Sequence, residues 1–209
     1  MSTLNVAFGF KAHSGWAALV VIAGPASAYQ VLDRRRIELV EAGNAAWGPQ
    51  PYHAADGLDP DEANAVVERG IEAARRAAAV EINAALKRSR ARGHEVTACA
   101  VLVPAPMPPW STAEILAVHF RMHKAEGVLF PDALARAAKS CGLALAAVPE
   151  KTLWERAERE LRVSRAGLTD TIAALGKTAG PPWGKDQKSA TLAAMIALSA
   201  GLYRGSQVR

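Results

Sequence analysis

The sequence contains few cysteines, few aromatic residues and no long hydrophobic run. Cys99 and Cys141 are the only cysteines among 209 residues, which excludes a disulfide-rich scaffold. Two thiols suit a reducing compartment, so we predict a cytoplasmic protein in which both act as small hydrophobic side chains. No apolar run approaches the roughly 20 residues that a membrane-spanning helix needs, so we expect no membrane partner. Aromatic residues make up only 6% of the chain, and the core must therefore consist mainly of Ala, Val, Leu and Ile.

Hydrophobic residues are abundant, at 50% of the chain, beside 22% charged residues. This composition excludes intrinsic disorder and supports a continuous core. Because no linker, repeat or low-complexity segment interrupts the chain, we predict a single domain over residues 1–209. The net charge of +5 permits binding to nucleic acid or another polyanion. It does not require such a partner, because the basic residues are spread along the chain.

The N-terminal 40 residues have the pattern of three strands. Apolar runs at 4–10 and 16–23 are separated by a polar turn, which favours a β-hairpin over the signal peptide that residues 11–28 imitate. A third strand is expected within 29–40, after the break at Gly24-Pro25. Residues 43–60 are rich in proline and glycine and predict a loop.

The rest of the chain alternates helices with buried strands. Apolar residues recur at intervals of three and four over 61–92, which predicts a long helix. Short apolar runs at 96–103 and 143–148 predict buried strands. Ser111 and Glu114 have the spacing of a capping box, which begins a helix that we expect to end near Glu126. Further helices are expected at 131–140, 149–161, 164–175 and 186–200.

This order of elements predicts an α/β fold with a mixed five-stranded sheet and helices on both faces. The first three strands should be antiparallel neighbours. The strands at 96–103 and 143–148 should run parallel to the first strand.

Segments at both ends of the chain carry a family resemblance. Residues 8–11 and 14–20 form a hairpin with a Gly-aromatic-small step at the start of its second strand. In the second half of the chain, the resemblance is carried by residues 125–127, 148–149 and 184–190. On these segments and the topology, the chain resembles the ribonuclease H-like fold, and especially the RuvC-like Holliday-junction resolvases.

The resemblance implies phosphodiester hydrolysis by two divalent metals held between carboxylates on the first strand, the end of the fourth strand and the last helix. Here Phe10 or Lys11 occupies the first position, residues 101–105 contain no acid, and only Asp186 matches. One matching carboxylate cannot hold two magnesium ions. We therefore expect no metal or other cofactor and a pseudoenzyme without the nuclease site. Three acids could supply replacements from other positions: Glu38, Glu114 and Glu150.

Two Pro-Pro-Trp motifs, each ahead of a predicted helix, suggest a ligand site. If both border the cleft of the resolvases, their tryptophans would offer stacking surfaces and nearby lysines would offer cations to a nucleic acid. This hypothesis assigns ligand binding to Lys11, Trp110, Trp183, Lys185 and Lys188. The alternative, which we favour, is that the prolines fix helix entry and each tryptophan packs on the edge of the core.

His119 and His123 are one helical turn apart, a spacing that can chelate zinc. A third ligand is needed, and in the sequence only Glu126 stands close to them, so we expect two exposed histidines without a metal.

Three functions remain open: a non-catalytic nucleic-acid or polyanion-binding protein, an enzyme, or a protein-interaction scaffold. The enzyme would be a nuclease or other phosphoester hydrolase with a rebuilt site, for which the candidate residues are Lys11, His13, Ser14 and Asp186. A binder, unlike a scaffold, should expose basic and aromatic groups around one concavity. An enzyme, unlike a binder, should bring charged groups of that cleft into contact.

Overall fold

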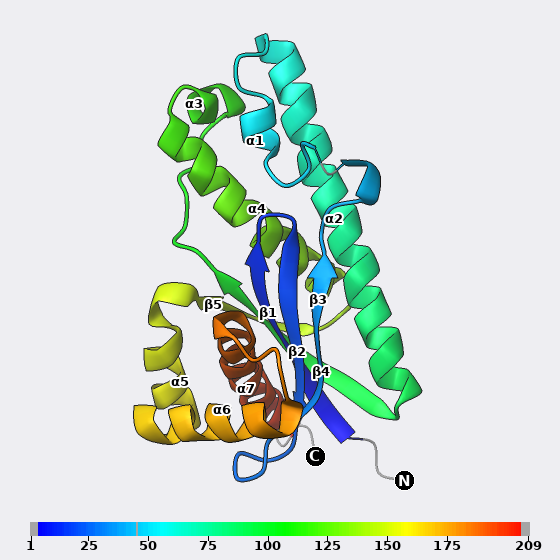
Figure 1. Ribbon diagram of the computed structural model, residues 1–209, viewed down its shortest axis with the longest axis vertical. Coiled ribbons are helices and arrows are strands. Elements are labelled where there is room, and N and C mark those ends of the chain that lie inside the picture. The colour runs from blue at the N-terminus through cyan, green and yellow to red at the C-terminus, as the bar shows by residue number, and fades with distance from the viewer. Residues whose placement is uncertain (1–3, 45, 206–209) are drawn as a thin grey trace.

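The computed structural model describes residues 4–44 and 46–205. Its centre is a five-stranded sheet of order β3-β2-β1-β4-β5 (Figure 1). The strands are β1 (Leu4–His13), β2 (Trp16–Ala23), β3 (Gln30–Glu38), β4 (His94–Val103) and β5 (Ala144–Pro149). β2 is antiparallel to β1 and β3, whereas β4 is parallel to β1 and to β5. The predicted mixed sheet and the direction of each strand are confirmed.

Two helical layers cover the sheet (Figure 1). α2 (Pro60–Ala91) and α4 (His119–Ser140) pack against the even-numbered side chains of β1, among them Phe8 and Phe10. On the other face lie α5 (Leu153–Leu161), α6 (Arg165–Ala179) and α7 (Lys185–Gly205), against the face that includes Ala7. Because side chains alternate along a strand, each face of β1 meets its own layer. Both layers are rich in alanine, as the low aromatic content requires.

Helix α7 approaches β1 unusually closely at Gly9. A Cβ added to Gly9 would lie 1.9 Å from the carbonyl oxygen of Ala190 and 2.9 Å from the Cβ of Ala194. The described part of α7 from Ala190 to Leu198 is buried. The absence of a side chain at position 9 therefore allows the backbone of α7 to pack directly against the backbone of β1.

A smaller lobe extends beyond the strand ends (Figure 1). It contains η1 (Ala42–Asn44), α1 (Pro51–Ala54), α3 (Thr112–Leu116) and the adjoining ends of α2 and α4. Tyr52, Val67, Ile115 and Met122 form its core. Ser111 Oγ accepts a hydrogen bond from the Glu114 backbone N–H, and the Glu114 carboxylate accepts one from the Ser111 backbone N–H, which confirms the predicted capping box.

The loop predicted for 43–60 is wrong in part, because this segment contains most of η1 and all of α1. Pro51 stands in the first turn of α1, where a missing N–H costs no helical hydrogen bond. Its ring packs where a Cβ of Gly70 would lie, at 2.3 Å, and Tyr52 is buried beside it. Tertiary packing thus supports a helix of only four residues.

The division into helices ending near Glu126 and starting at Pro131 is also wrong. The chain breaks earlier, at Val118, which is extended, and α4 then continues through Pro131. Proline removes one helical hydrogen bond, but Phe130, Pro131 and Leu134 are buried on the inner face of α4. Burial of that face holds the helix together across the proline.

Arginine side chains bind backbone carbonyls on both edge strands of the sheet. Arg92 donates to the Leu32 carbonyl of β3 at 3.3 Å, and Arg156 donates to the Ala147 carbonyl of β5 at 2.8 Å. Arg34 of β3 donates to the carbonyls of Ala179, Pro181 and Pro182 and so ties the segment before α7 to the sheet. No described helix is long and apolar enough to cross a membrane.

Candidate functional site

The carboxyl ends of β1, β4 and β5 meet at one end of the sheet because these three strands are parallel. A pocket of about 260 Å³ opens there, between the strand ends and α4. Its lining includes Lys11, His13, Ser14, Pro104, Glu126 and Glu150. Three of the four predicted catalytic residues, those of the β1–β2 hairpin, therefore lie in one pocket.

Lys11 of β1 is paired with a carboxylate that follows the edge strand β5. Its Nζ lies 2.6 Å from Oε2 of Glu150, the first residue of η2 (Glu150–Thr152) after β5. The Lys11 side chain is only 14% exposed, whereas that of Glu150 is 41% exposed. A cation this far removed from water needs a partner, and Glu150 supplies it.

His13 contacts the second carboxylate, Asp186, in the first turn of α7. The His13 Nε2 lies 3.0 Å from Oδ1 of Asp186. Nevertheless, this nitrogen has no hydrogen bond of acceptable geometry to any described residue. The contact is thus one of proximity alone, and it does not orient the imidazole as a hydrogen-bonded base would be oriented.

An aromatic and cationic stack continues from His13 along the sheet. The His13 ring stacks on Trp16 with ring centroids 4.4 Å apart, and the Arg36 guanidinium lies 4.2 Å from the centroid of Trp16. Trp16 is half-buried. Sequence reasoning did not select Trp16 or Arg36, although their adjacent strands and shared face follow from the register of β2 with β3.

Glu126 of α4 lines the pocket together with Glu150, and it is 3% exposed. It accepts hydrogen bonds from the backbone N–H of His53, at 3.1 Å, and from Gln50 Nε2, at 3.4 Å. The His53 ring nitrogen Nδ1 lies 2.8 Å from both of its oxygens. Burial and, to a lesser extent, Glu126 raise the pKa of Tyr52 beside it. Sequence reasoning missed His53, because it lies in the segment expected to be a loop.

The acids considered as replacements have different roles. Glu150 lines the pocket but is bound to Lys11. Glu38 pairs with Arg36, and Glu114 belongs to the capping box with Ser111. Hydrogen bonds from Ser111 hold the pKa of Glu114 below its usual range.

The two Pro-Pro-Trp motifs do not form one surface. Trp110 packs at the edge of the lobe core, with Arg121 4.7 Å from its ring centroid. Trp183 packs against the α7 layer, over Gly176, and its Nε1 donates to the Ile172 carbonyl. Trp183 therefore fits the interpretation as a packing residue at the edge of the core. Lys185 and Lys188 are exposed at the start of α7 and form no ion pair with a described residue.

No family model matches the sequence, and no curated protein is significantly similar to it. Among solved structures, the chain is similar to RuvC of Thermus thermophilus, with a TM-score of 0.50 and 12% identity over 96% of each chain. A structure of T. thermophilus RuvC in complex with a Holliday junction substrate gives a TM-score of 0.49 and 12% identity, covering 96% of this chain and 95% of that one.

Proposed function

Because the chain has the RuvC-like, ribonuclease H-like fold, we propose that it binds nucleic acid, or another polyanion of the same phosphate chemistry, across the carboxyl ends of β1, β4 and β5. In this proposal the cleft binds without cutting. The carrying observation is that exposed cations lie at the same end of the sheet as a pocket whose own acids, Glu126 and Glu150, each contact a basic side chain.

The donor set of the cleft does not fit a magnesium pair. Two-metal hydrolysis needs several carboxylates converging on both ions. Here β1 offers Lys11, and residues 101–105 at the end of β4 contain no acid. The three carboxylates present contact Lys11, His13 and His53. Two magnesium ions would have to displace each of these side chains and overcome the repulsion from the positive charge of Lys11.

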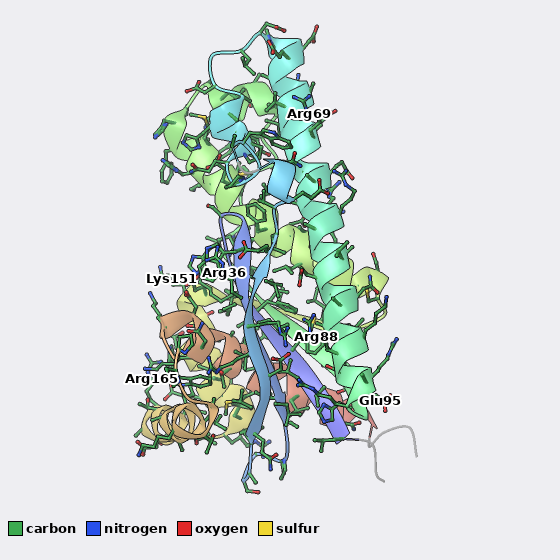
Figure 2. The ribbon with its side chains drawn as sticks, turned by 45° about the vertical axis from the view of Figure 1, so that its right-hand side comes forward. Arg36, Arg69, Arg88, Glu95, Lys151 and Arg165 are labelled. Carbon is green, nitrogen blue, oxygen red and sulfur yellow. The ribbon has the colours of Figure 1, made fainter. Side chains whose placement is uncertain are left out.

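Exposed basic side chains at this end suit phosphate groups. Figure 2 shows Arg36 and Lys151 at the end of the sheet where the pocket opens. Lys185 and Lys188 add two cations at the start of α7, where backbone N–H groups and the helix dipole also favour an anion. The stack of Arg36 on Trp16 adds an aromatic group to the same end. Such a mixture of cations and aromatic rings is typical of single-strand binders.

The contact between His13 and Asp186 favours a second candidate, a phosphoester hydrolase with His13 as its base and Ser14 beside it. A base must be oriented by a hydrogen bond to act on a nucleophile. His13 Nε2 makes none to the described residues, and Lys11 and Asp186 belong to separate pairs. Binding is therefore the better-supported proposal.

Fluorescence anisotropy with labelled single-stranded, duplex and branched DNA tests the proposal. Each phosphate contact contributes about 0.9 to the slope of log K against log salt on duplex DNA. Replacing both lysines in Lys185→Ala/Lys188→Ala should therefore weaken binding and lower that slope by up to ~1.8. The matched control Lys87→Ala/Lys139→Ala removes the same charge from exposed lysines on α2 and α4 and should leave the slope unchanged.

Equal effects of the two double variants would show that only net charge matters. Absence of binding to all three DNAs at low salt would refute the proposal and favour the interaction scaffold. Incubation with branched DNA and Mg²⁺ should leave the substrate intact. Cleavage that disappears in Asp186→Asn would favour the enzyme instead.

A further inference from the structure

Three of the five histidines of the chain gather in the lobe, and one of them, His53, is the partner of the pocket residue Glu126. His53 lies on α1, and His119 and His123 lie on the first turns of α4, beside which α1 packs (Figure 1). One ring nitrogen from each of the three lies within 4.8 Å of those of the other two. The ring centroids are 4.6 to 5.1 Å apart.

We propose that His53, His119 and His123 bind one divalent transition metal of the zinc class. Three imidazoles and a water form the donor set of an open zinc site. With Zn–N bonds of about 2.0–2.1 Å, tetrahedral geometry places the ligand nitrogens about 3.3–3.4 Å apart. The Nε2 atoms of His119 and His123 are already 3.0 Å apart. The third nitrogen, from His53, lies within 4.8 Å of both and would move closer to complete the set.

Glu126 fixes the third ligand. Its carboxylate lies 2.8 Å from His53 Nδ1. In the tautomer whose Nδ1–H donates to this carboxylate, Nε2 holds the lone pair that binds a metal. A carboxylate that accepts from the second nitrogen of a ligating histidine orients the ring and raises its basicity. Glu126 is held in turn by the His53 backbone N–H and Gln50. We therefore assign Glu126 as a positioning residue for the metal.

The nitrogen ligands set the selectivity. Imidazole suits zinc, copper, nickel and cobalt, whereas magnesium and calcium require oxygen ligands. His119 and His123 are exposed and the His53 side chain is 25% exposed, so solvent can reach the fourth position. The bound metal would join α1 to α4. Glu126 would connect this site to the cleft, because it contacts His53 and also lines the pocket.

Zinc titration of the tag-free protein against a chromophoric chelator tests this site. We expect one zinc per chain, and Co²⁺ in its place should give the intense visible absorption of a tetrahedral complex. His53→Ala and His119→Ala should each reduce affinity by roughly 100-fold or more, and Glu126→Gln by about 10–100-fold with an unchanged cobalt spectrum. The matched control is His94→Ala, a half-buried histidine at the start of β4, which should bind zinc as the wild type does.

Absence of stoichiometric zinc in the wild type would overturn the proposal, as would equal loss in His94→Ala. Undiminished binding by His53→Ala would reduce the site to a surface pair on α4 and also overturn it. If circular dichroism shows that His53→Ala does not fold, Glu126→Gln decides the matter: a surface pair of His119 and His123 would bind zinc undiminished in that variant, which would also overturn the proposal.

Discussion

The contact between Gly9 and α7 predicts that a single methyl group will destabilise the whole domain. In Gly9→Ala the new Cβ would overlap the carbonyl oxygen of Ala190, 1.9 Å away, and lie 2.9 Å from the carbonyl carbon of the same residue. Both are backbone atoms, so no side-chain rotation relieves the overlap. Helix α7 would have to move outward by more than about 1 Å, against the tight packing of its buried face.

Overpacking a core by a methylene costs typically about 1–3 kcal/mol, and a clash with backbone belongs at the upper end of that range. We therefore expect Gly9→Ala to lower the free energy of unfolding by about 3 kcal/mol. For a domain of this size each kcal/mol changes Tm by about 2–4 °C, which gives a fall of about 6–12 °C. Urea denaturation followed by circular dichroism and tryptophan fluorescence measures the free energy, and a constant m value would show that the unfolded state is unaffected.

Gly127→Ala is the matched control. Gly127 lies inside α4, and no atom is within 4 Å of the position of an added Cβ. Alanine has the higher helix propensity, so this variant should gain about 0.5–1 kcal/mol. A Gly9→Ala variant within 1 kcal/mol of the wild type would refute the inferred approach of α7 to β1, whatever the control shows.

Three further predictions follow from individual groups. Burial raises the pKa of Cys99 to about 12. A thiol reagent should therefore modify only the half-buried Cys141 in the native protein, and both thiols after unfolding. Modification of Cys99 at the same rate as Cys141 in the native protein would contradict its burial. The lowered pKa of Glu114 means that the capping box stabilises the fold above the ordinary pKa of a glutamate and loses this contribution as the pH falls through the lower value in the folded protein. Melting curves should therefore show a Tm difference between wild type and Ser111→Ala at pH 7 that shrinks toward pH 3. Glu150→Gln should destabilise the protein by about 1–2 kcal/mol, because it leaves the largely buried Lys11 unpaired, whereas Lys11→Met should cost less because Glu150 can reach water.

The sequence predicts best where one local signal determines the outcome. A continuous apolar run between turn residues gave the bounds of β2, and Ser111 with Glu114 gave the start of α3. The resemblance of the hairpin and last helix to the resolvases led to the correct fold. The continuity of α4 could not be predicted in this way, because the burial of Phe130 and Leu134 that holds it across Pro131 depends on tertiary packing.

The contacts of the candidate site are long-range and therefore have no local signal. The pairing of Lys11 with Glu150 joins residues separated by 139 positions, and that of His53 with Glu126 joins residues 73 apart. The spacing of His119 and His123 allowed chelation, but the sequence led us to expect two exposed histidines without a metal, because the third histidine lies on a four-residue helix that propensity does not predict. Topology brings these groups together, and only the structure shows their contacts.

Arg92 at the end of α2 and Arg156 on α5, which bind the edge strands, protect the sheet against recruitment of a further strand. An unpaired strand edge is a template for intermolecular β-pairing and for fibre growth. Arg92 and Arg156 each bind a carbonyl of one edge strand, at Leu32 and Ala147, and so hold a charged side chain against that strand. Three consecutive arginines, at positions 34 to 36, also place positive charge along β3. The apolar, alanine-rich β5 lacks such charge, which makes its Arg156 cover the more important safeguard against aggregation.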